Sequence, residues 1–515
     1  MYGVWTPEQV ATAEEPVLAR TPEGALMRRA AYGAAQVAVR MLAERCGGVA
    51  GRHVVVLVGT GNNGGDGLWA GVELRRRGVG VTAVLLRPDH AHPAGLAALT
   101  AARARVLTTP EHAVPAIGRA DLVLDAVVGT SARGGLRTPA PLLVGAADTA
   151  GVPVLAIDTP SGVDPTTGTV PEATAEGPAA VTAAETVTFG ARKPVHVLAR
   201  DRCGPVTFVD IGLGPELPAP PITVLDAADV GARWPVPGPG DDKYTQGVVG
   251  IAAGSATYPG AAVLASGAAC LATSGMVRYA GSAADEVRAA WPEVVATDHV
   301  ADAGRVQAWA VGPGLGTDED GGATLRHVLD AGVPVLADAD AVTLLGADAG
   351  LRATAAGLPV LVTPHAGEFA RLVAELTEFT DAPDVSADRV DAARRAAAAL
   401  GVTVLLKGNA TVVAAPDGRV LVHPAGSSWL ATAGSGDVLS GIAGALLAAG
   451  LEPFDAAGAA AFVHARAAEL GASGVRAPRR ATTGDAAPVG APVPASHVQA
   501  AIPDAIRSVR AEARR

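Results

Sequence analysis

The sequence predicts an α/β protein of two three-layer αβα domains, and three observations lead to this fold class. Short valine-rich apolar runs alternate with helical segments in both halves of the chain. Such alternation is typical of a parallel sheet covered by helices on both faces. Aromatic side chains are only 3% of the 515 residues, so alanine, valine and leucine must fill the cores. Stretches rich in proline and glycine, at 214–221 and 234–242, separate the two halves.

The first half is predicted to begin with helix over residues 1–45. Thr6 is a suitable N-cap, because Pro7 and Gln9 then occupy the first and third helical positions. A second helix is predicted over 68–77. The strands predicted in this half are 53–59, 81–86, 121–129, 152–158, 185–190 and 204–212.

The second half repeats the alternation after a linker. The predicted domains are 1–215 and 244–515, joined by a linker, 216–243, that includes an edge strand. A long helix of small residues is predicted after Gly434, then a loop from about 477 to 494 and a last helix from near His497. The strands predicted in this half are 247–255, 308–314, 333–340, 358–364 and 402–408.

Charge and cysteine content exclude several classes of protein. The net charge of −11 argues against binding nucleic acid or an anionic membrane through bulk charge. Cys46, Cys203 and Cys270 are far apart and form neither a disulfide framework nor a CxxC metal site. The N-terminus lacks the basic and apolar regions of a signal peptide. We therefore expect a cytoplasmic protein that does not enter the membrane.

The segment GTGNNGGDG (59–67) is the first candidate binding loop. It follows a predicted strand and precedes a predicted helix, where free N–H groups and the helix dipole attract an anion. Its spacing matches neither GxGxxG nor a P-loop. Asn62, Asn63 and Asp66 add polar atoms that a plain turn does not need. The simpler alternative is a Gly/Asn turn capped by an aspartate.

Polar residues also follow the next two strands. Asp125 ends the strand 121–129, Asp158 ends the strand 152–158, and Ser161 follows directly. Because the carboxyl ends of parallel strands meet at one rim, we expect them to lie near Asn63. Their oxygen atoms suit a hard cation. The alternative is that both aspartates only cap loops.

The segment LATAGSGDVLSG (430–441) is the strongest signal in the second half. A turn of small residues opens a helix whose first turn contains Asp437. Backbone N–H groups from Gly434 to Gly436 can stabilise a phosphoryl group in transfer. Asp437 can accept the proton of an attacking hydroxyl. The alternative is an acidic residue that only complements the helix dipole.

Other strand ends of this half carry further candidate residues. Lys407 is one of only three lysines in the chain and, with Thr411 in KGNAT, suits a nucleotide phosphate or an adenosine pocket. TPHAGEFARL places His365 after a strand, where we expect it to bind a ligand. Asp338 and Asp340 are candidates for the Mg²⁺ side of a site or for hydrogen bonding.

Four segments in order make residues 5–213 resemble the NAD(P)H-hydrate epimerase family, which has a Rossmann-like fold: PEGALMRRAA, GNNGGDG, DAVVGT and IDTPSGVD. The resemblance implies that Asn63, Asp125 and Ser161 hold K⁺, and that Asp158 is the acid–base residue near C6 of the hydrated nicotinamide ring. Ser131 departs from the family, whose members often have glycine there. The residues implied to bind the damaged nucleotide are Asn62, Asn63, Gly64, Gly65, Asp66, Gly129, Thr130, Ser131, Ala132, Arg133, Gly134, Gly135 and Asp158.

AGSGD at a helix start resembles the ribokinase-like superfamily, whose aspartate is the hydroxyl base. The fuller set of YTQGVVGIAAGS, YPGAA, GPGLG, TPHAGEF and KGNAT makes 225–512 resemble the ADP-dependent NAD(P)H-hydrate dehydratase family. Ala433 and Ser435 replace glycine and threonine of the family pattern. The resemblance implies that Mg²⁺ bridges the phosphates. The residues implied to contact the hydrated nucleotide are Ala261, Gly316, His365 and Asp437, and those implied to contact ADP are Lys407, Gly408, Asn409, Ala410, Thr411 and Gly436.

The order of the two halves resembles the bifunctional NAD(P)H-hydrate repair enzymes. The resemblance implies that the first domain interconverts the R and S hydrates of NADH and NADPH. The second domain would dehydrate the S form with ADP, giving AMP and phosphate. One alternative is a ribokinase-like small-molecule kinase with an N-terminal regulatory domain, and another is a nucleotide sensor without activity. The expected partners are these small nucleotides, and the alanine-rich helices favour a homo-oligomer.

Overall fold

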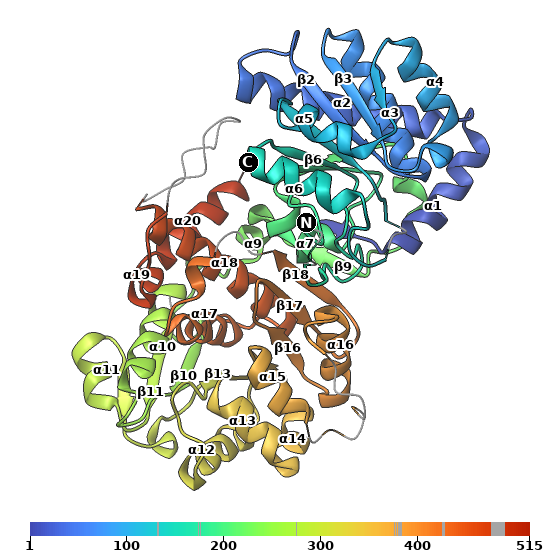
Figure 1. The fold of residues 1–515 in the computed structure, drawn as a ribbon. Helices are drawn as coiled ribbons and strands as arrows, with labels where there is room; N and C mark the ends of the chain where they lie inside the picture. The colour runs from blue at the N-terminus through green and yellow to red at the C-terminus, as the bar shows by residue number, and fades with distance from the viewer. Residues whose placement is uncertain are drawn as a thin grey trace. The chain divides into compact units, whose positions relative to one another are not determined.

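The computed structural model describes residues 1–130, 133–173, 175, 177–273, 275–374, 376, 379, 384–424, 428–474 and 490–514. The chain divides into two compact units, one of Gly3–Ile222 and one of Met1–Tyr2 with Thr223–Arg515. Each unit is built on its own sheet (Figure 1).

The N-terminal unit is built on a seven-stranded sheet in the order β4-β3-β2-β5-β6-β7-β8, in which all the paired strands are parallel. The strands are β2 (His53–Val58), β3 (Gly80–Leu85), β4 (Arg105–Leu107), β5 (Leu122–Ala126), β6 (Val154–Ile157), β7 (Glu185–Phe189) and β8 (Val206–Val209). The helices are α1 (Pro7–Arg20), α2 (Ala25–Cys46), α3 (Gly61–Arg76), α4 (Pro93–Ala101), α5 (Val114–Ile117), α6 (Ala140–Ala150), α7 (Val195–Leu198) and α8 (Arg200–Cys203).

Helices cover both faces of this sheet. Successive side chains of a strand point to opposite faces, so Val54 and Val56 of β2 pack with α2 and α3. Val55 and Leu57 pack in a second cluster with α5 and α6 (Figure 1). Strands β3 and β4 are added on one side of β2, and β5 to β8 are added on the other side, so the strand order reverses between β2 and β5. Ligands of open α/β sheets bind at such a switch point.

The predicted start of the first helix is confirmed. Thr6 caps α1 in a full capping box with Gln9, and Pro7 is the first helical residue. The predicted continuous helix over 1–45 is wrong, because residues 2–4 form the short strand β1 (Tyr2–Val4) and 21–24 separate α1 from α2. Helix α1 ends before Thr21, whose backbone is extended, and Gly24, with φ +70°, is the N-cap of α2.

The glycine-rich segment 59–67 is mostly helix rather than a loop. Helix α3 begins at Gly61, whereas the sequence predicted a start at 68. The glycines permit close packing: a Cβ at Gly64 would lie 2.4 Å from the carbonyl oxygen of Gly59, and one at Gly67 would lie 2.4 Å from Cβ of Ala126. Packing therefore overrides the low helix propensity of glycine.

The second unit contains an eleven-stranded sheet in the order β1-β9-β18-β17-β16-β15-β14-β13-β10-β11-β12. It is mixed, because β17 runs antiparallel to both β16 and β18. Its further strands are β9 (Ile222–Val224), β10 (Val248–Ala252), β11 (Met276–Ala280), β12 (Val295–Thr297), β13 (Ala308–Val311), β14 (Val335–Ala337), β15 (Val360–Val362), β16 (Thr403–Leu406), β17 (Ala410–Ala414) and β18 (Val420–Pro424).

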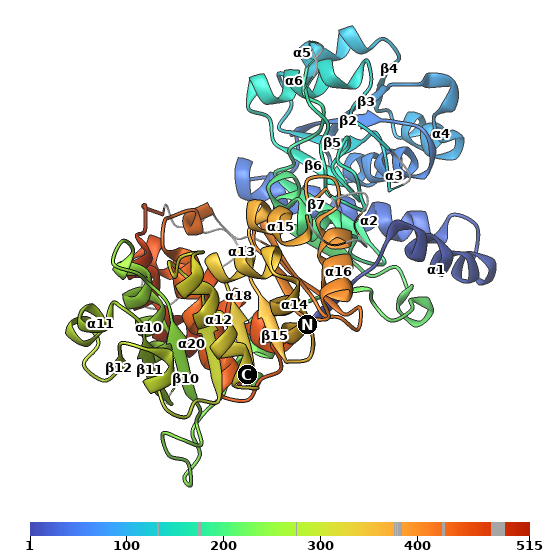
Figure 2. The same cartoon turned by 90° about the horizontal axis from the view of Figure 1, so that it is seen from below.

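Two layers of helices flank this sheet as well. Helices α10, α17 and α18 share one core with Ile251 and Leu361, whereas Leu345 and Leu372 lie beside Val362 on the other face. Figure 2 shows α12 to α15 together on one side of the sheet. The helices are α9 (Ala227–Arg233), α10 (Pro259–Ala272), α11 (Ala284–Ala290), α12 (Glu319–Asp330), α13 (Asp340–Ala347), α14 (Ala349–Ala356), α15 (Ala366–Val373), α16 (Arg389–Leu400), α17 (Ser435–Ala448), α18 (Pro453–Ser473), α19 (Ala495–Ala500) and α20 (Ile502–Glu512).

The predicted fold class is confirmed, with corrections in the second half. All five strands predicted there are present, but β11, β12, β17 and β18 were missed, and β9 lies between β1 and β18 rather than at an edge. The helix predicted after Gly434 is two helices, because Gly450 with φ +93° ends α17 and Pro453 begins α18. Most of the predicted loop at 477–494 lies outside the described residues. Within the described part of the chain, no helix has the length and apolar character that crossing a bilayer requires.

Candidate functional site

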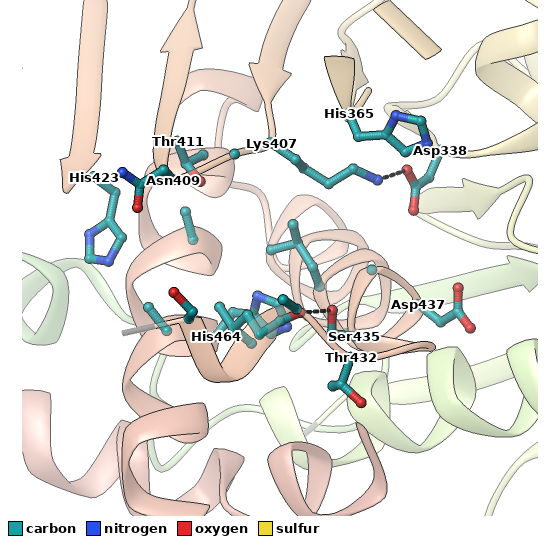
Figure 3. A pocket seen from close by; sticks show the side chains of 18 of the residues that line it. Asp338, His365, Lys407, Asn409, Thr411, His423, Thr432, Ser435, Asp437 and His464 are labelled. Carbon is teal, nitrogen blue, oxygen red and sulfur yellow. Dashed lines mark hydrogen bonds and ion pairs between the residues drawn. The ribbon is translucent and has the colours of Figure 1, made fainter. Parts of the chain in front are cut away.

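A cavity of about 820 Å³ opens in the second unit where three neighbouring strands end (Figure 3). Asp338 directly follows β14, His365 lies shortly after β15, and Lys407 directly follows β16. Helix α17 brings Asp437 to the same cavity. The cavity is lined by Asp338, Ala339, His365, Glu368, Lys407, Gly408, Asn409, Thr411, His423, Ser428, Leu430, Ala431, Thr432, Ser435, Gly436, Asp437, Leu439, Ala461, His464, Ala465 and Glu469.

Lys407 lies among carboxylates in this cavity (Figure 3). Its Nζ is 2.7 Å from Oδ1 of Asp338 and 3.7 Å from Oε2 of Glu368. The hydroxyl of Ser440 donates to Oδ2 of Asp338 at 2.8 Å, which fixes the carboxylate. Burial works to lower the pKa of Lys407, but these carboxylates outweigh it and the pKa is raised. Lys407 is therefore a fixed cation beside Gly436, where a Cβ would lie 3.6 Å from Nζ.

Asp437 is the third residue of α17. Gly434 precedes the helix with φ +83°, and no side chain in the described part of the chain caps the first turn. Burial and, to a smaller extent, the charge of Asp338 raise the pKa of Asp437 to about 6, against the lowering effect of Lys407. At neutral pH the carboxylate is ionised yet basic enough to take a proton, as a general base must be. Free N–H groups and a base thus meet at one helix end.

His365 is the N-cap of α15. Its Nδ1 accepts hydrogen bonds from the backbone N–H groups of Gly367 at 3.0 Å and Glu368 at 3.3 Å. The side chain of Glu368 accepts from the backbone N–H of His365 at 2.8 Å, which completes a capping box. Because Nδ1 serves as the acceptor, the neutral ring carries its proton on Nε2. Only Nε2 can then donate to a ligand.

The other predicted residues of this unit lie in two places. Gly408 and Asn409 form the turn between β16 and β17, and they line the cavity with Thr411, whereas Ala410 is buried in β17. Ala261 and Gly316 lie outside the lining of this cavity, as far as the described residues define it. Ala261 lies in the first turn of α10 and Gly316 in the loop after β13, and these segments meet: a Cβ at Gly314 would lie 3.2 Å from Cβ of Ala261. The N–H of Gly316 donates to Asp340 at 2.9 Å.

Two histidines in the cavity wall were not among the predicted site residues. Burial lowers the pKa of both His423 and His464 to about 4, so both are neutral. Nε2 of His464 is buried and has no hydrogen-bond partner in the described part of the chain. His423 packs edge-on against Phe462, with 5.3 Å between the ring centres. His423 lies in β18 and His464 in α18, and no sequence pattern links either histidine to the Gly-rich motif.

In the N-terminal unit, Asp125 and Ser161 are fully buried and bonded to each other. Oδ1 of Asp125 accepts from the hydroxyl of Ser161 at 2.6 Å, and Oδ2 accepts from its backbone N–H at 2.8 Å. The side-chain amide of Asn63 donates to the carbonyl of Val128 at 2.9 Å. Burial raises the pKa of Asp125 to about 6, although hydrogen bonds from Ser161 and Val127 act to lower it. No cationic side chain among the described residues contributes to this lowering.

Asp158 is held by a lysine in a neighbouring loop. Nζ of Lys193 lies 2.6 Å from Oδ1 of Asp158, and the hydroxyl of Thr188 donates to the same oxygen at 2.9 Å. Lys193 also donates to Thr188 and to the carbonyl of Phe189. Burial works to raise the pKa of Asp158, but Lys193 and Thr188 outweigh it and the pKa is lowered. The carboxylate is therefore kept ionised.

His196 fixes the backbone around this ion pair. Its Nδ1 accepts from the backbone N–H of Lys193 at 2.9 Å, so its Nε2–H donates to the carbonyl of Asp158 at 2.8 Å. Burial and the charge of Lys193 lower the pKa of His196 to about 4, and the ring is neutral. Asp158 has φ +68°, which costs energy for any residue with a Cβ. Strain of this kind is most common at functional sites.

The remaining predicted residues of this unit surround Asp158 or lie on a neighbouring loop. Asp66, on α3, lies close enough to Asp158 for that charge to raise its pKa. Gly129 packs on Asn63, where a Cβ would lie 3.3 Å from that of Asn63. Arg133 forms an ion pair with Asp164 at 3.2 Å. Ser131 and Ala132 lie outside the described residues. The others fall on the first turns of α3 or on the described parts of this loop: Asn62, Gly64, Gly65, Thr130, Gly134 and Gly135.

Comparison with known proteins assigns each half to a family. A family model described as "NAD(P)H-hydrate dehydratase" matches residues 249–481, and one described as "YjeF-related protein N-terminus" matches 23–195. The "Bifunctional NAD(P)H-hydrate repair enzyme Nnr" of Mycobacterium tuberculosis (strain CDC 1551 / Oshkosh) is 54% identical over 457 residues, which cover 89% of this chain and 91% of that protein.

The chain belongs to the family of bifunctional NAD(P)H-hydrate repair enzymes. The Escherichia coli (strain K12) member is 33% identical over 433 residues, 81% of each chain. The crystal structure of the ADP/ATP-dependent NAD(P)H-hydrate dehydratase from Bacillus subtilis, co-crystallised with ATP/Mg²⁺, is 28% identical, with a TM-score of 0.45; the match covers 55% of this chain and 96% of that one. The predicted family and the predicted bifunctional repair function are confirmed, and these matches do not support the kinase alternative.

Several residues that shape the two sites of this family member were not predicted. Asp338 was predicted only as a candidate for the Mg²⁺ side or for hydrogen bonding, and Lys193 is one of the three lysines of the chain but was not predicted as a site residue. Glu14, Thr188 and His196 were not singled out. The scarcity of lysine is the one signal that could have found Lys193, since two of the three lysines lie buried beside the candidate aspartates.

Proposed function

We propose that each unit of this bifunctional NAD(P)H-hydrate repair enzyme carries one of the two reactions. The site around Asp158 interconverts the R and S hydrates, and the cavity around Asp437 dehydrates the S hydrate with ADP. One observation supports both assignments: in each unit a partly buried aspartate of the site lies close enough to a lysine for the positive charge to lower the pKa of the carboxyl group. A base and a fixed cation are what proton transfer beside phosphate chemistry needs.

In the dehydratase cavity, Asp437 takes the proton of the C6 hydroxyl. The hydroxyl oxygen then attacks the terminal phosphorus of ADP, the bond to AMP breaks, and AMP leaves. The phosphorylated intermediate loses phosphate from C6 and a proton from C5, which restores the C5=C6 double bond of NADH or NADPH. Lys407 and the N–H groups at the start of α17 stabilise the phosphoryl charge. His365 and Gly408 to Thr411 hold the two nucleotides.

Mg²⁺ fits this cavity as an ion that enters with the nucleotide. No group of three or more His, Cys, Asp or Glu residues within the described ranges could hold a metal by itself. Mg²⁺ is usually bound through one or two carboxylates together with substrate phosphates. Asp338, which lines the cavity, and Asp340, two residues further along the chain, would hold it, and the ion would neutralise phosphate charge.

K⁺ fits the donor set of the N-terminal unit. Asn63, Asp125 and Ser161 offer an amide oxygen, a carboxylate and a hydroxyl, which are ligands for a hard cation. A cation there would also neutralise the buried Asp125 carboxylate. It would hold the loop after β5 in place for the phosphates of the hydrate, while Asp158 moves protons at C6.

The test is a single assay with a mixture of the R and S hydrates of NADH. The protein, Mg²⁺ and ADP should restore the full dihydronicotinamide absorbance, in a fast phase for the S form and a slower phase limited by epimerisation. Recovery that stops once the S form is consumed would refute the epimerase assignment. No recovery with either ADP or ATP would refute the dehydratase assignment.

The dehydratase reaction should depend on the ionisation of Asp437. Because the pKa of Asp437 is about 6 and the base must be unprotonated, kcat/KM for the S hydrate should rise with pH and level off above about pH 7. Initial rates with saturating ADP, measured between pH 5 and 8 in buffers of constant ionic strength, check this. A rate independent of pH across this range would contradict the role of Asp437.

Ser161→Ala should weaken the response of epimerisation to K⁺. The variant removes one oxygen ligand and the 2.6 Å hydrogen bond to Asp125, so we expect the K⁺ concentration for half-maximal rate to rise by about tenfold. The measurement is epimerase rate against KCl concentration, with choline chloride keeping the ionic strength constant. Thr167→Val, a hydroxyl deletion in a neighbouring loop, is the control, and an unchanged K⁺ response of Ser161→Ala would contradict the proposed site.

The remaining proposals concern the setting in which the enzyme works. Cys46, Cys203 and Cys270 are free, which supports a reducing cytoplasm. The homo-oligomer expected from the alanine-rich helices stays a prediction, which light scattering of the purified protein can decide.

A further inference from the structure

The carboxyl group of Asp66 is buried in the N-terminal site without a full set of partners. Its Oδ1 is inaccessible to solvent and has no hydrogen-bond partner among the described residues. An ionised carboxylate would lose its hydration at this oxygen with nothing in return, whereas a protonated one loses far less. An unpartnered buried oxygen therefore indicates either a neutral carboxyl group or a group that meets its partner in the substrate.

The surroundings of Asp66 favour the neutral form. Burial raises its pKa well above the ordinary value, and the negative charges of Asp158 and Glu14 raise it further. Among the described residues, only the positive charge of Lys193 acts to lower the pKa of Asp66. Asp158, on the loop after β6, is instead stabilised in its ionised form. Nζ of Lys193 lies 2.6 Å from its Oδ1, and the hydroxyl of Thr188 donates to the same atom.

Two neighbouring carboxyl groups are thus held in different protonation states. Lys193 bonds only one of them, so a single proton shared by the pair belongs on Asp66. His196 fixes the backbone of both Asp158 and Lys193, which keeps this asymmetry from relaxing. Pairs of carboxyl groups whose environments differ in this way commonly serve as the acid and the base of one reaction.

We propose that Asp66 is a second catalytic residue of epimerisation, the acid that works with the base Asp158. The proposal rests on the assignment of the epimerase reaction to this site. It gives Asp66 a proton to donate, beyond a role in holding the nucleotide, and it makes Lys193 the positioning residue that decides which carboxyl group carries the proton.

The reaction balances with these two groups. The lone pair of ring N1 forms the N1=C6 double bond as the C–O bond breaks, and Asp66 protonates the departing hydroxyl, which leaves as water. The planar iminium carbon can be attacked from either face. Water adds to C6 from the other face, its O–H proton passes to Asp158, and the π electrons return to N1. Proton transfer from Asp158 back to Asp66, favoured by Lys193, restores the starting state.

Asp66→Asn tests the donor role with little change in shape. We expect its epimerase kcat to fall by about 10²–10⁴-fold, the usual contribution of a general acid. The dehydratase rate on pure S hydrate, measured on the same preparation, should stay within twofold of the wild type and reports that the second unit is folded. A near-UV circular dichroism spectrum and an unfolding transition like those of the wild type report that the N-terminal unit is folded. An epimerase kcat within threefold of the wild type would overturn the proposal.

Glu14→Gln supplies a readout that a purely structural role of Asp66 would not move. Epimerisation needs Asp66 protonated, so its rate falls at the pH where Asp66 ionises. Removing the charge of Glu14 should shift this fall to lower pH, because that charge holds the pKa of Asp66 up. Glu15→Gln, an exposed neighbour on α1, should leave the pH profile unchanged. Identical profiles for Glu14→Gln and the wild type would overturn the proposal.

Asp158→Asn separates this inference from the assignment on which it rests. If Asp158→Asn and Asp66→Asn both lose epimerisation and keep dehydration, the site assignment and the acid role of Asp66 are both supported. If only Asp158→Asn loses it, the acid role of Asp66 fails while the site assignment holds. If Asp158→Asn keeps wild-type epimerisation, the assignment of the reaction to this site fails, and the acid role fails with it.

Discussion

Asp437→Asn is expected to lower the dehydratase kcat by about 10²–10⁴-fold, because asparagine cannot accept the proton of the C6 hydroxyl. The asparagine side chain has nearly the same shape, so the helix start, Gly434 to Gly436, should keep its geometry. The KM for ADP should change little, since Asp437 acts on the hydroxyl rather than on the phosphates. The measurement is steady-state kinetics on pure S hydrate with ADP.

Two controls accompany this variant. Epimerase activity of the same preparation should be unchanged, because Asp437 belongs to the other unit. Asp417→Asn changes an exposed turn between β17 and β18 and should keep both activities within twofold. A dehydratase kcat of Asp437→Asn within threefold of the wild type would contradict its role as the base.

Lys407→Met should impair both nucleotide binding and stability. The variant leaves the buried carboxylates of Asp338 and Glu368 without their cation. Breaking a buried ion pair on one side costs about 3–5 kcal/mol. Because the Lys407 side chain is 22% exposed, we expect the free energy of unfolding of its unit to fall by about 2–4 kcal/mol. The affinity for ADP should fall by at least about tenfold, since a charged contact to phosphate is lost.

Isothermal titration with ADP and urea unfolding measure these two effects. The double variant Lys407→Met with Asp338→Asn should recover part of the stability, because the unpaired carboxylate is gone, but none of the ADP affinity. If the double variant recovered the affinity as well, Lys407 would act only through Asp338. Wild-type affinity in the single variant would exclude Lys407 from the nucleotide site.

Sequence patterns were most successful for site residues near strand ends and at helix starts. Asp125 and Ser161 follow two neighbouring strands, and the structure places them 2.6 Å apart. Asp437 was expected in the first turn of a helix, and it is the third residue of α17. In both cases the chain geometry around a strand end or a helix start is local, so a short stretch of sequence contains the information.

The site residues that could not be predicted are brought to their sites by contacts between segments far apart in the sequence. Glu14 lies on the first helix and no sequence pattern links it to Asp66, yet its charge adds to burial and to Asp158 in raising the pKa of Asp66. His464 looks like any histidine on a helix until α18 brings it to the cavity wall. The start of α3 was misplaced because glycine has poor helix propensity, and only contact with Gly59 and Ala126 explains why glycines are needed there.

Helices α3 and α17 both begin without a capping hydrogen bond to the N-cap side chain. Their N-caps are Thr60 and Gly434, and in neither helix does a described side chain accept a hydrogen bond from the first turn. The N-cap residues thus leave the first amides without a capping bond, although the backbone N–H of Ser435 donates to the carbonyl of Thr432 at 3.3 Å and Thr6 shows that the chain can form a full capping box elsewhere. A bound phosphate would complete each helix, so these amides should exchange rapidly with deuterium in the free protein and slowly once the ligand is present. Hydrogen exchange could therefore report the occupancy of each site separately, without any turnover.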